Sequence, residues 1–303
     1  MITKNINNII DDLTIGNVVG LPTETVYGLA ANAFNEAAIQ KIYSLKNRPT
    51  SNPLILHTHS IEEIYKYIID NDSNRTLLEL ANEYWPGPLT ILLEKNERIL
   101  DIVTSGSQYV AFRIPNHPLI LEILQNLPFP IAAPSANPYQ SISPTTANQV
   151  YYYFGEKISY ILDGGKCACG IESTIIGMEK NDLIIYRQGA ITIEQLKNKI
   201  ENVKVNDSGS SSIKTSGMSK THYAPKTRMI IVNDIEDYIR NNKHQKIGVL
   251  SFDKMNMHSI AKNYYHHLYE LDKKGYDIII TKKFINTGIG RALNDKIQRA
   301  ISK

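Results

Sequence analysis

The chain has 303 residues, of which 42% are hydrophobic, and its formal net charge is only +3. A chain of this length can bury a full core and has room for two domains. Asp11 and Asp12 lie where a signal peptide would need an unbroken apolar run, and no later segment approaches the roughly 18 apolar residues of a membrane span. We therefore expect a globular cytoplasmic protein with no membrane contact.

Short β-rich runs alternate with amphipathic helices through residues 1–200. Ile2 and Ile6 share a helical face with the apolar residues at positions 9, 10 and 13. Further helices are predicted around 39–46, 77–84, 118–127 and 145–154. Strands are predicted in the runs VVGL, PLIL, PLTILLE, YVAFRI, PIAAPS, SYILDG, STIIGM and DLIIYR. This order predicts an α/β fold with one large, twisted mixed sheet and flanking helices.

A change of composition marks a domain boundary after this first unit. Residues 206–221, NDSGSSSIKTSGMSKT, are rich in Ser, Gly and Lys and nearly free of apolar residues. Beyond them, MIIVN, KIGVLSF and YDIIIT are three evenly spaced strands with helices between, and GIGRALNDKIQRAI closes the chain. We predict a first domain over 1–205, a linker over 206–225, and a small three-layer, Rossmann-like α/β domain with a parallel sheet over 226–303.

The segment from Val18 to His57 concentrates groups suited to an anion. The hydroxyls of Thr23 and Thr25 follow an apolar strand, while Lys46 and Arg48 leave a helix where the next residue is proline. Both sets can converge at strand ends, where phosphate, carboxylate or both are the natural ligands. The alternative is that the two cations only complement the helix dipole, which is worth about 0.3 to 1 kcal/mol.

Two other features have plain interpretations. Cys167 and Cys169 form a single C-x-C, which lacks the ligands of a structural zinc site and gives no disulfide framework, so we interpret them as inert thiols.

Residues 262–303 contain nine Lys/Arg against four Asp/Glu. That excess is typical of a nucleic-acid surface or of a solvated helical face, and we favour the solvated face.

Taken together, the motifs resemble one family. The runs PTETVYGLA, KNRP, NPLILH, PGPLT, VAFRIP, APSAN, SPTT, GIESTII and YRQGA, followed after the linker by SGMSKTHYAP, are similar to the Sua5/YrdC/YwlC family of threonylcarbamoyl-AMP synthases. The likeness extends from about residue 15 to the C-terminus. One-domain, YrdC-like relatives stop near residue 200, so the HYAP segment and the domain after it indicate the two-domain Sua5 branch.

The resemblance implies a nucleotidyltransferase reaction. L-threonine and bicarbonate (or CO2) form N-carboxythreonine, whose carboxylate attacks the α-phosphate of ATP to give L-threonylcarbamoyladenylate and pyrophosphate, with Mg²⁺ accompanying ATP. A separate transferase then receives the threonylcarbamoyl group and modifies adenosine 37 of tRNAs that read codons beginning with A. Because the substrate carboxylate attacks, the chemistry requires alignment, positive charge and exclusion of water rather than a protein nucleophile.

The resemblance also implies the site residues. The threonine site falls on Thr25, His57, Arg113, Ala133 and Ser173. The ATP site falls on Lys46, Arg48, Asn52, Tyr109, Ser135, Ser143, Arg187 and Tyr223, and Lys46 and Arg48 are expected to stabilise phosphate charge. Tyr109 stands where the family often has a smaller hydroxyl residue. Neither Glu24 nor Glu172 is assigned a role, and no protein ligand is assigned to the metal.

These residues also have structural interpretations. Arg113 could be an exposed charge at a strand end, and Arg187 could pair with a carboxylate on the sheet. His57 could be a satisfied histidine at a strand end, while Ser135 and Ser143 could merely shape turns.

Hypotheses about the whole protein also stay open. If the linker folds over the first domain, Tyr223 reaches the nucleotide as part of a lid; otherwise the linker is a tether. A carbamoyl-adenylate-forming hydrogenase-maturation enzyme shares the first domain's motifs, but it needs cysteine-rich zinc modules that two cysteines cannot build. An RNA-binding module without adenylation activity would use the basic C-terminal stretch for a weak tRNA or RNA contact. The last alternative is a structural or regulatory role for the C-terminal domain.

Overall fold

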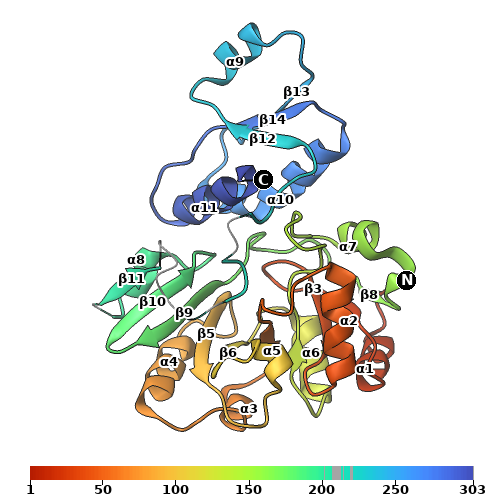
Figure 1. Ribbon diagram of the computed structural model, residues 1–303, viewed down its shortest axis with the longest axis vertical. Helices are drawn as coiled ribbons and strands as arrows, with labels where there is room; N and C mark the ends of the chain where they lie inside the picture. Colours follow the sequence, from red (N-terminus) through yellow and green to blue (C-terminus); the bar gives the residue numbers. More distant parts are fainter. Residues whose placement is uncertain (201, 207–212, 214, 219–220, 303) are drawn as a thin grey trace.

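The computed structural model describes residues 1–200, 202–206, 213, 215–218 and 221–302, which form two α/β units (Figure 1). The first contains an eleven-stranded mixed sheet with the strand order β1-β8-β2-β3-β7-β4-β6-β5-β9-β10-β11. Its strands are β1 Ile2–Thr3, β2 Val19–Leu21, β3 Gly28–Asn32, β4 Ile55–His57, β5 Leu89–Glu94, β6 Tyr109–Arg113, β7 Ile131–Ala132, β8 Ile161–Leu162, β9 Thr174–Glu179, β10 Asp182–Arg187 and β11 Val203–Val205.

Helices flank this sheet, as predicted. They are α1 Ile6–Thr14, α2 Glu36–Lys46, α3 Ile61–Tyr65, α4 Asp72–Asn82, α5 Asp101–Thr104, α6 Pro118–Asn126, α7 Ala147–Phe154 and α8 Ile193–Lys197, with the 3₁₀ turn η1 Gly155–Lys157. The helix expected to end before Pro49 does so, because α2 ends at Lys46 and Asn47 takes the left-handed conformation that closes a helix.

The placement of Ile2 on a helical face is wrong, because that residue lies in strand β1 and pairs with Ile161 of β8. Strands β3 and β11 were not predicted either. Strand β3 begins inside a motif that was interpreted as a turn and pairs with the distant strand β7, and β11 has only three residues, so local periodicity reveals neither.

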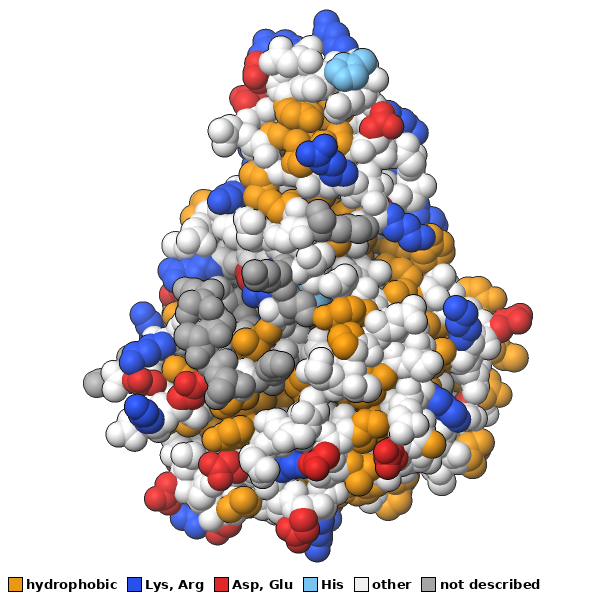
Figure 2. Space-filling view, viewed as in Figure 1, with side chains coloured by type: hydrophobic (Ala, Val, Ile, Leu, Met, Phe, Trp, Pro, Cys, Tyr) orange, Lys and Arg blue, Asp and Glu red, His pale blue; other side chains and the backbone are white. Residues whose placement is uncertain are grey.

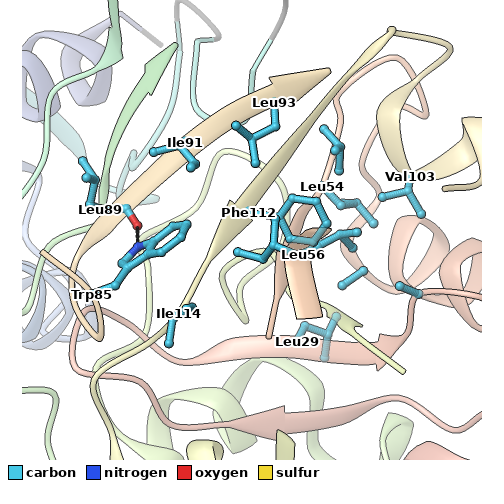
Figure 3. Packing of buried hydrophobic residues seen from close by; sticks show 14 of the residues in the cluster. Leu29, Leu54, Leu56, Trp85, Leu89, Ile91, Leu93, Val103, Phe112 and Ile114 are labelled. Carbon is cyan, nitrogen blue, oxygen red and sulfur yellow. Dashed lines mark hydrogen bonds between the residues drawn. The ribbon is translucent and has the colours of Figure 1, made fainter. Parts of the chain in front are cut away.

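The core of the first unit lies at the central strands. Leu54, Leu56 and Phe112 pack with side chains of β5, and the indole nitrogen of Trp85 donates to the Leu89 carbonyl at 2.7 Å (Figure 3). Strands β4 and β6 are parallel neighbours, and His57 lies directly beside Arg113 in their register. Two polar residues are therefore presented at one end of a largely buried strand pair.

The second unit has the predicted parallel sheet, with the order β12-β14-β13. Its elements are β12 Arg228–Ile231, α9 Ile235–Asn241, β13 Ile247–Leu250, α10 Met257–Lys273, β14 Ile278–Thr281 and α11 Ile289–Ile301. Helices α10 and α11 lie between this sheet and the first unit (Figure 1). None of the helices in the described part of the chain is long and apolar enough to cross a membrane.

The two units pack closely. Val26, Ile142 and Ile171 of the first unit belong to the same buried apolar cluster as the tyrosines of α10. Gly170 has a φ of +75°, and a Cβ at this position would lie 2.5 Å from the Lys262 Cα. Only glycine accommodates both the backbone conformation and this approach of α10. Residues 207–212, 214 and 219–220 of the predicted linker lie outside the described residues, so the boundaries at 205 and 225 stay predictions.

Candidate functional site

One pocket gathers the predicted threonine residues. Thr25 precedes β3, His57 and Arg113 end β4 and β6, Ala133 follows β7, and Ser173 precedes β9; all five line the pocket. They come from five separate segments, which the sheet topology brings together at one end of neighbouring strands.

Arg113 is held in a fixed orientation. Its side chain is buried, donates to the Thr25 hydroxyl at 2.8 Å and to the Gly87 carbonyl at 3.2 Å, and lies 2.6 Å from a Glu24 carboxylate oxygen. The interpretation of Arg113 as an exposed strand-end charge is therefore wrong. A buried, pre-oriented guanidinium on a pocket wall is suited to receive a carboxylate.

His57 is a neutral ring in this pocket. Burial, followed by the nearby Arg113 charge, lowers the pKa of His57 to about 3. Its Nδ1 atom has no hydrogen-bond partner among the described residues. A neutral imidazole with a free ring nitrogen can bond to a ligand's ammonium, amide or hydroxyl group.

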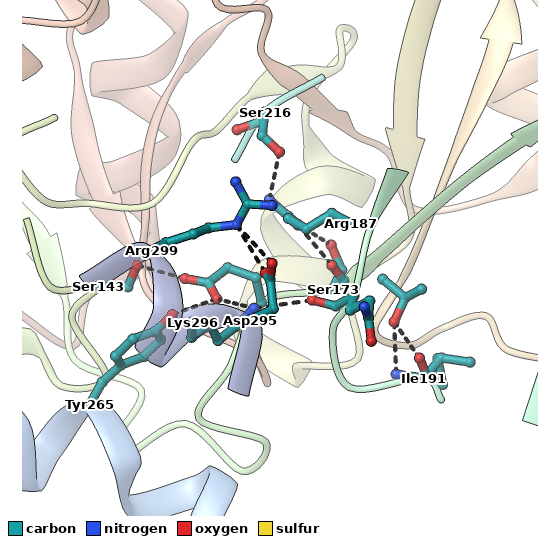
Figure 4. Close-up of polar contacts among 12 residues, drawn as sticks. Ser143, Ser173, Arg187, Ile191, Ser216, Tyr265, Asp295, Lys296 and Arg299 are labelled. Atoms are coloured by element: carbon teal, nitrogen blue, oxygen red, sulfur yellow. Dashed lines mark hydrogen bonds and ion pairs between the residues drawn. The ribbon is translucent and has the colours of Figure 1, made fainter. Parts of the chain in front are cut away.

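Arg187 lines the pocket, whereas Arg48 is not among the lining residues and contacts the pocket through Ser216. Arg187 donates to the Ser173 hydroxyl at 2.8 Å and to the Ser216 carbonyl at 3.3 Å (Figure 4). Arg48 donates to the Asn52 side chain at 2.6 Å and to the Ser216 hydroxyl at 3.2 Å. Ser216 therefore bridges the two guanidinium groups.

Among the described residues, these two arginines have no acidic partner. Both side chains are buried, and within the described ranges no carboxylate forms an ion pair with either of them. Burial lowers the pKa of Arg48 to about 10. Buried cations that are bonded only to neutral oxygens are costly unless an anion joins them. The arrangement indicates a site for a strongly anionic ligand.

The other predicted ATP residues fall into two groups. Ser135 and Tyr223 line the pocket beside Arg187, whereas Lys46, Asn52, Ser143 and Tyr109 are not among its lining residues. Lys46 is fully buried and donates to the carbonyls of Ser135 and Asn137, both at 2.5 Å. Tyr109 begins β6, at the end opposite Arg113.

Three polar residues of the pocket, Glu172, Ser216 and His222, were given no role in the sequence-based site, and Thr23 was predicted only as part of a general anion-binding segment. All four line the pocket. Thr23 shapes its wall, because its hydroxyl donates to the Val26 carbonyl at 2.6 Å and bonds to the Thr25 hydroxyl at 2.9 Å. Thr23, Glu172 and His222 stand inside motifs that were recognised. Ser216 begins the SGMSKTHYAP motif, but its contacts with the two arginines could not be predicted, because they depend on how the segment folds back.

His222 and His57 predict a pH dependence of stability. Burial, then the charges of Arg48, Lys46, Arg187 and Lys296, lowers the pKa of His222 well below its usual range. A histidine with a depressed folded-state pKa stabilises the fold above the unfolded-state pKa and loses that contribution as pH falls.

We expect the free energy of unfolding to decrease between pH 6.5 and 5, by up to about 1.4 kcal/mol per pH unit for each histidine. Urea unfolding at several pH values measures this slope. A His222→Asn variant that is folded should show a smaller slope; an equal slope would contradict this role for His222.

No preformed metal cage is evident in the described ranges, where no group of three His, Cys, Asp or Glu side chains is placed to hold an ion. Glu24 is engaged by Arg113, and Glu172 by Ser143, Tyr265 and Lys296. The fold and pocket thus define a class: an α/β protein with a cationic pocket at the strand ends of a large mixed sheet, whose wall is completed by linker residues and contacted from outside by a second α/β unit.

Comparison with known proteins identifies the family. A family described as "Telomere recombination" matches residues 11–189, and "Threonylcarbamoyl-AMP synthase, C-terminal domain" matches residues 191–302. Curated proteins called threonylcarbamoyl-AMP synthase are similar: that of Pyrococcus abyssi is 34% identical, covering 94% of this chain and 90% of the relative, and that of Bacillus subtilis is 34% identical, covering 93% and 89%.

A solved structure agrees. The crystal structure of P. abyssi Sua5 complexed with L-threonine matches with a TM-score of 0.90 and 32% identity, covering 98% of this chain and 94% of that one. The chain belongs to the family of threonylcarbamoyl-AMP synthases in its two-domain Sua5 form. The family and the fold predicted from the sequence are confirmed.

Proposed function

We propose that this protein makes L-threonylcarbamoyladenylate and pyrophosphate from L-threonine, bicarbonate and ATP, as a nucleotidyltransferase. The observation that carries the proposal is the pairing, in one place, of a carboxylate-binding pocket around Arg113 with two buried arginines that have no acidic partner in the described ranges. The first is suited to an amino acid and the second to a triphosphate. Relatives called threonylcarbamoyl-AMP synthase, one of them solved with L-threonine, support the same assignment.

The threonine carboxylate is assigned to Arg113, with the hydroxyls of Thr25 and Ser173 and the ring of His57 as further polar partners. Ala133 is small and leaves room for the branched side chain. The amino group carries the added carboxylate of N-carboxythreonine. Its oxygen attacks the α-phosphorus, the bond to the bridging oxygen of pyrophosphate breaks, and pyrophosphate leaves with that electron pair.

ATP is assigned to the side of Arg48 and Arg187, with Ser135 and Tyr223 as further contacts. The two guanidinium groups stabilise the charge that moves onto pyrophosphate. Magnesium, entering with ATP, would neutralise phosphate charge, and the phosphates would supply its main ligands because Glu24 and Glu172 are already engaged. Lys46 supports the site from outside the pocket, because its ammonium group donates to two carbonyls of the loop that carries Ser135. Asn52 acts indirectly, because it accepts a hydrogen bond from Arg48, and Ser143 acts indirectly, because it donates to Glu172. Tyr109 has no role in this arrangement.

We also propose that the linker is a lid. Ser216 contacts both arginines, and Tyr223, which is 1% exposed, packs into the pocket wall. This position excludes water from the labile mixed anhydride while it persists. The product would then pass to a separate transferase that modifies position 37 of tRNAs.

Pyrophosphate release tests the function. With ATP, magnesium and bicarbonate, we expect release to depend on L-threonine and the adenylate to be detectable by mass spectrometry. Release without threonine dependence would contradict the proposal and favour an RNA-binding module. Figure 2 gives that alternative little support on the face it displays, where Lys and Arg side chains are dispersed over both units rather than gathered in one stripe.

A further inference from the structure

The carboxylate of Glu172 connects the two units. Glu172 lines the pocket, and one of its oxygens accepts from the Ser143 hydroxyl at 2.7 Å. Its other oxygen accepts from the Tyr265 hydroxyl at 2.8 Å and lies 3.5 Å from the Lys296 Nζ. Tyr265 belongs to α10 and Lys296 to α11, so both come from the C-terminal unit (Figure 4).

Lys296 is a fully buried cation behind the pocket. Its side chain is 0% exposed, and the residue is not among those that line the cavity. Its Nζ donates to the Gln188 carbonyl at 3.0 Å and lies 5.0 Å from the centre of the Tyr223 ring. One ammonium group therefore contacts the pocket's acidic residue, the segment after Arg187, and the aromatic ring of the lid.

The negative charge of Glu172, if it were not neutralised, would weaken the binding of ATP. A carboxylate on the pocket wall repels a triphosphate, and a buried carboxylate is itself unfavourable without a cation. Lys296 supplies that cation from the far side, where it cannot compete with Arg48 and Arg187 for the phosphates. The pocket consequently keeps the positive charge of its arginines.

We propose that Lys296 is a positioning residue of the nucleotide site: it neutralises Glu172, holds the pocket wall at Glu172 and Tyr223, and thereby makes the C-terminal unit a necessary part of the first unit's pocket. The proposal rests on the proposed function, because it concerns the binding of ATP. A purely structural role for Lys296 would not depend on the charge of Glu172, whereas the proposed role does.

A charge-matched set of full-length variants tests it. Lys296→Met removes the ammonium and keeps a similar length, Glu172→Gln removes the negative charge, and the double variant removes both. Lys283→Met is the control, because Lys283 is an exposed residue of the same unit. Calorimetry with ATP and the KM values for ATP and threonine are measured for each protein.

We expect Lys296→Met to weaken ATP binding by about tenfold or more, equivalent to about 1.4 kcal/mol, with the KM for threonine changing by less than about threefold. The double variant should recover ATP affinity to within about threefold of the unmodified protein, because no unpaired carboxylate is left. Lys283→Met should bind ATP normally.

Two results would overturn the proposal. One is normal ATP affinity in a folded Lys296→Met variant, and the other is a double variant as weak as Lys296→Met, which would assign Lys296 to packing alone. If Lys296→Met does not fold, the proposal is tested by the ATP affinity of the double variant. An affinity more than about threefold below that of the unmodified protein would then contradict it. Failure of the unmodified protein to bind ATP would instead contradict the proposed function.

Discussion

An Arg113→Ala variant should lose threonine-dependent pyrophosphate release at threonine concentrations that saturate the unmodified protein. The substitution removes the fork that faces the amino-acid carboxylate and leaves Glu24 buried without its cation. Truncating one partner of a buried, hydrogen-bonded charge pair costs about 2 to 5 kcal/mol, so we expect kcat/KM for threonine to fall by at least about 30-fold. Initial rates of release over a range of threonine concentrations measure the change.

Two controls separate recognition from folding. Arg98→Ala removes an exposed arginine of the same unit and should leave the rates unchanged. Arg113→Lys keeps the charge but loses the fork, so it should recover only part of the activity. A folded Arg113→Ala protein with an unchanged KM for threonine would exclude Arg113 from the amino-acid site.

An Arg48→Ala variant should be impaired in ATP use rather than in threonine use. Arg48 has no acidic partner in the described ranges, so its removal leaves no buried carboxylate unpaired. We therefore expect the substitution to weaken the interaction with ATP rather than the fold. Removing one pre-organised donor that faces developing negative charge costs about 3 to 4 kcal/mol in an oxyanion hole, and by analogy we expect kcat/KM for ATP to fall by about 100-fold or more.

The matched comparison is Ser216→Ala, which removes only the hydroxyl that accepts from Arg48. We expect a decrease of less than about tenfold, because Arg48 keeps its bonds to Asn52 and Pro53. Equal losses in the two variants would mean that Arg48 acts by holding the linker rather than by binding phosphate.

Much of the fold was predictable because its strands are short apolar runs between clear turn signals. The runs around Leu56, Ile91 and Phe112 are buried central strands, as their composition indicated. Strand β1 escaped prediction because its partner β8 lies about 160 residues away, and two residues carry no periodicity of their own. Pairing over such a distance is decided by topology and not by local sequence.

The structure brings the residues of the expected threonine site together more completely than those of the expected ATP site. The threonine-site residues stand in motifs whose chemistry can be interpreted one residue at a time, and all five line the pocket. The part played by Tyr265 could not be predicted, because it bonds to Glu172 from 93 residues away across the contact between two units. A tyrosine on the apolar stripe of a helix looks like an ordinary core residue until the opposing surface is known.

The register between His57 and Arg113 fixes the backbone spacing of two residues of the proposed threonine site. The two residues are direct neighbours on parallel strands, so their backbones are about 4.8 Å apart, a spacing set by peptide hydrogen bonds and not by side chains. Substitution cannot widen that gap, and a register slip would turn every core side chain of β4 outward. In the proposed threonine site, the loops around Thr25, Ala133 and Ser173 are not fixed in this way, and we expect acceptance of bulkier amino acids to be engineered most readily there.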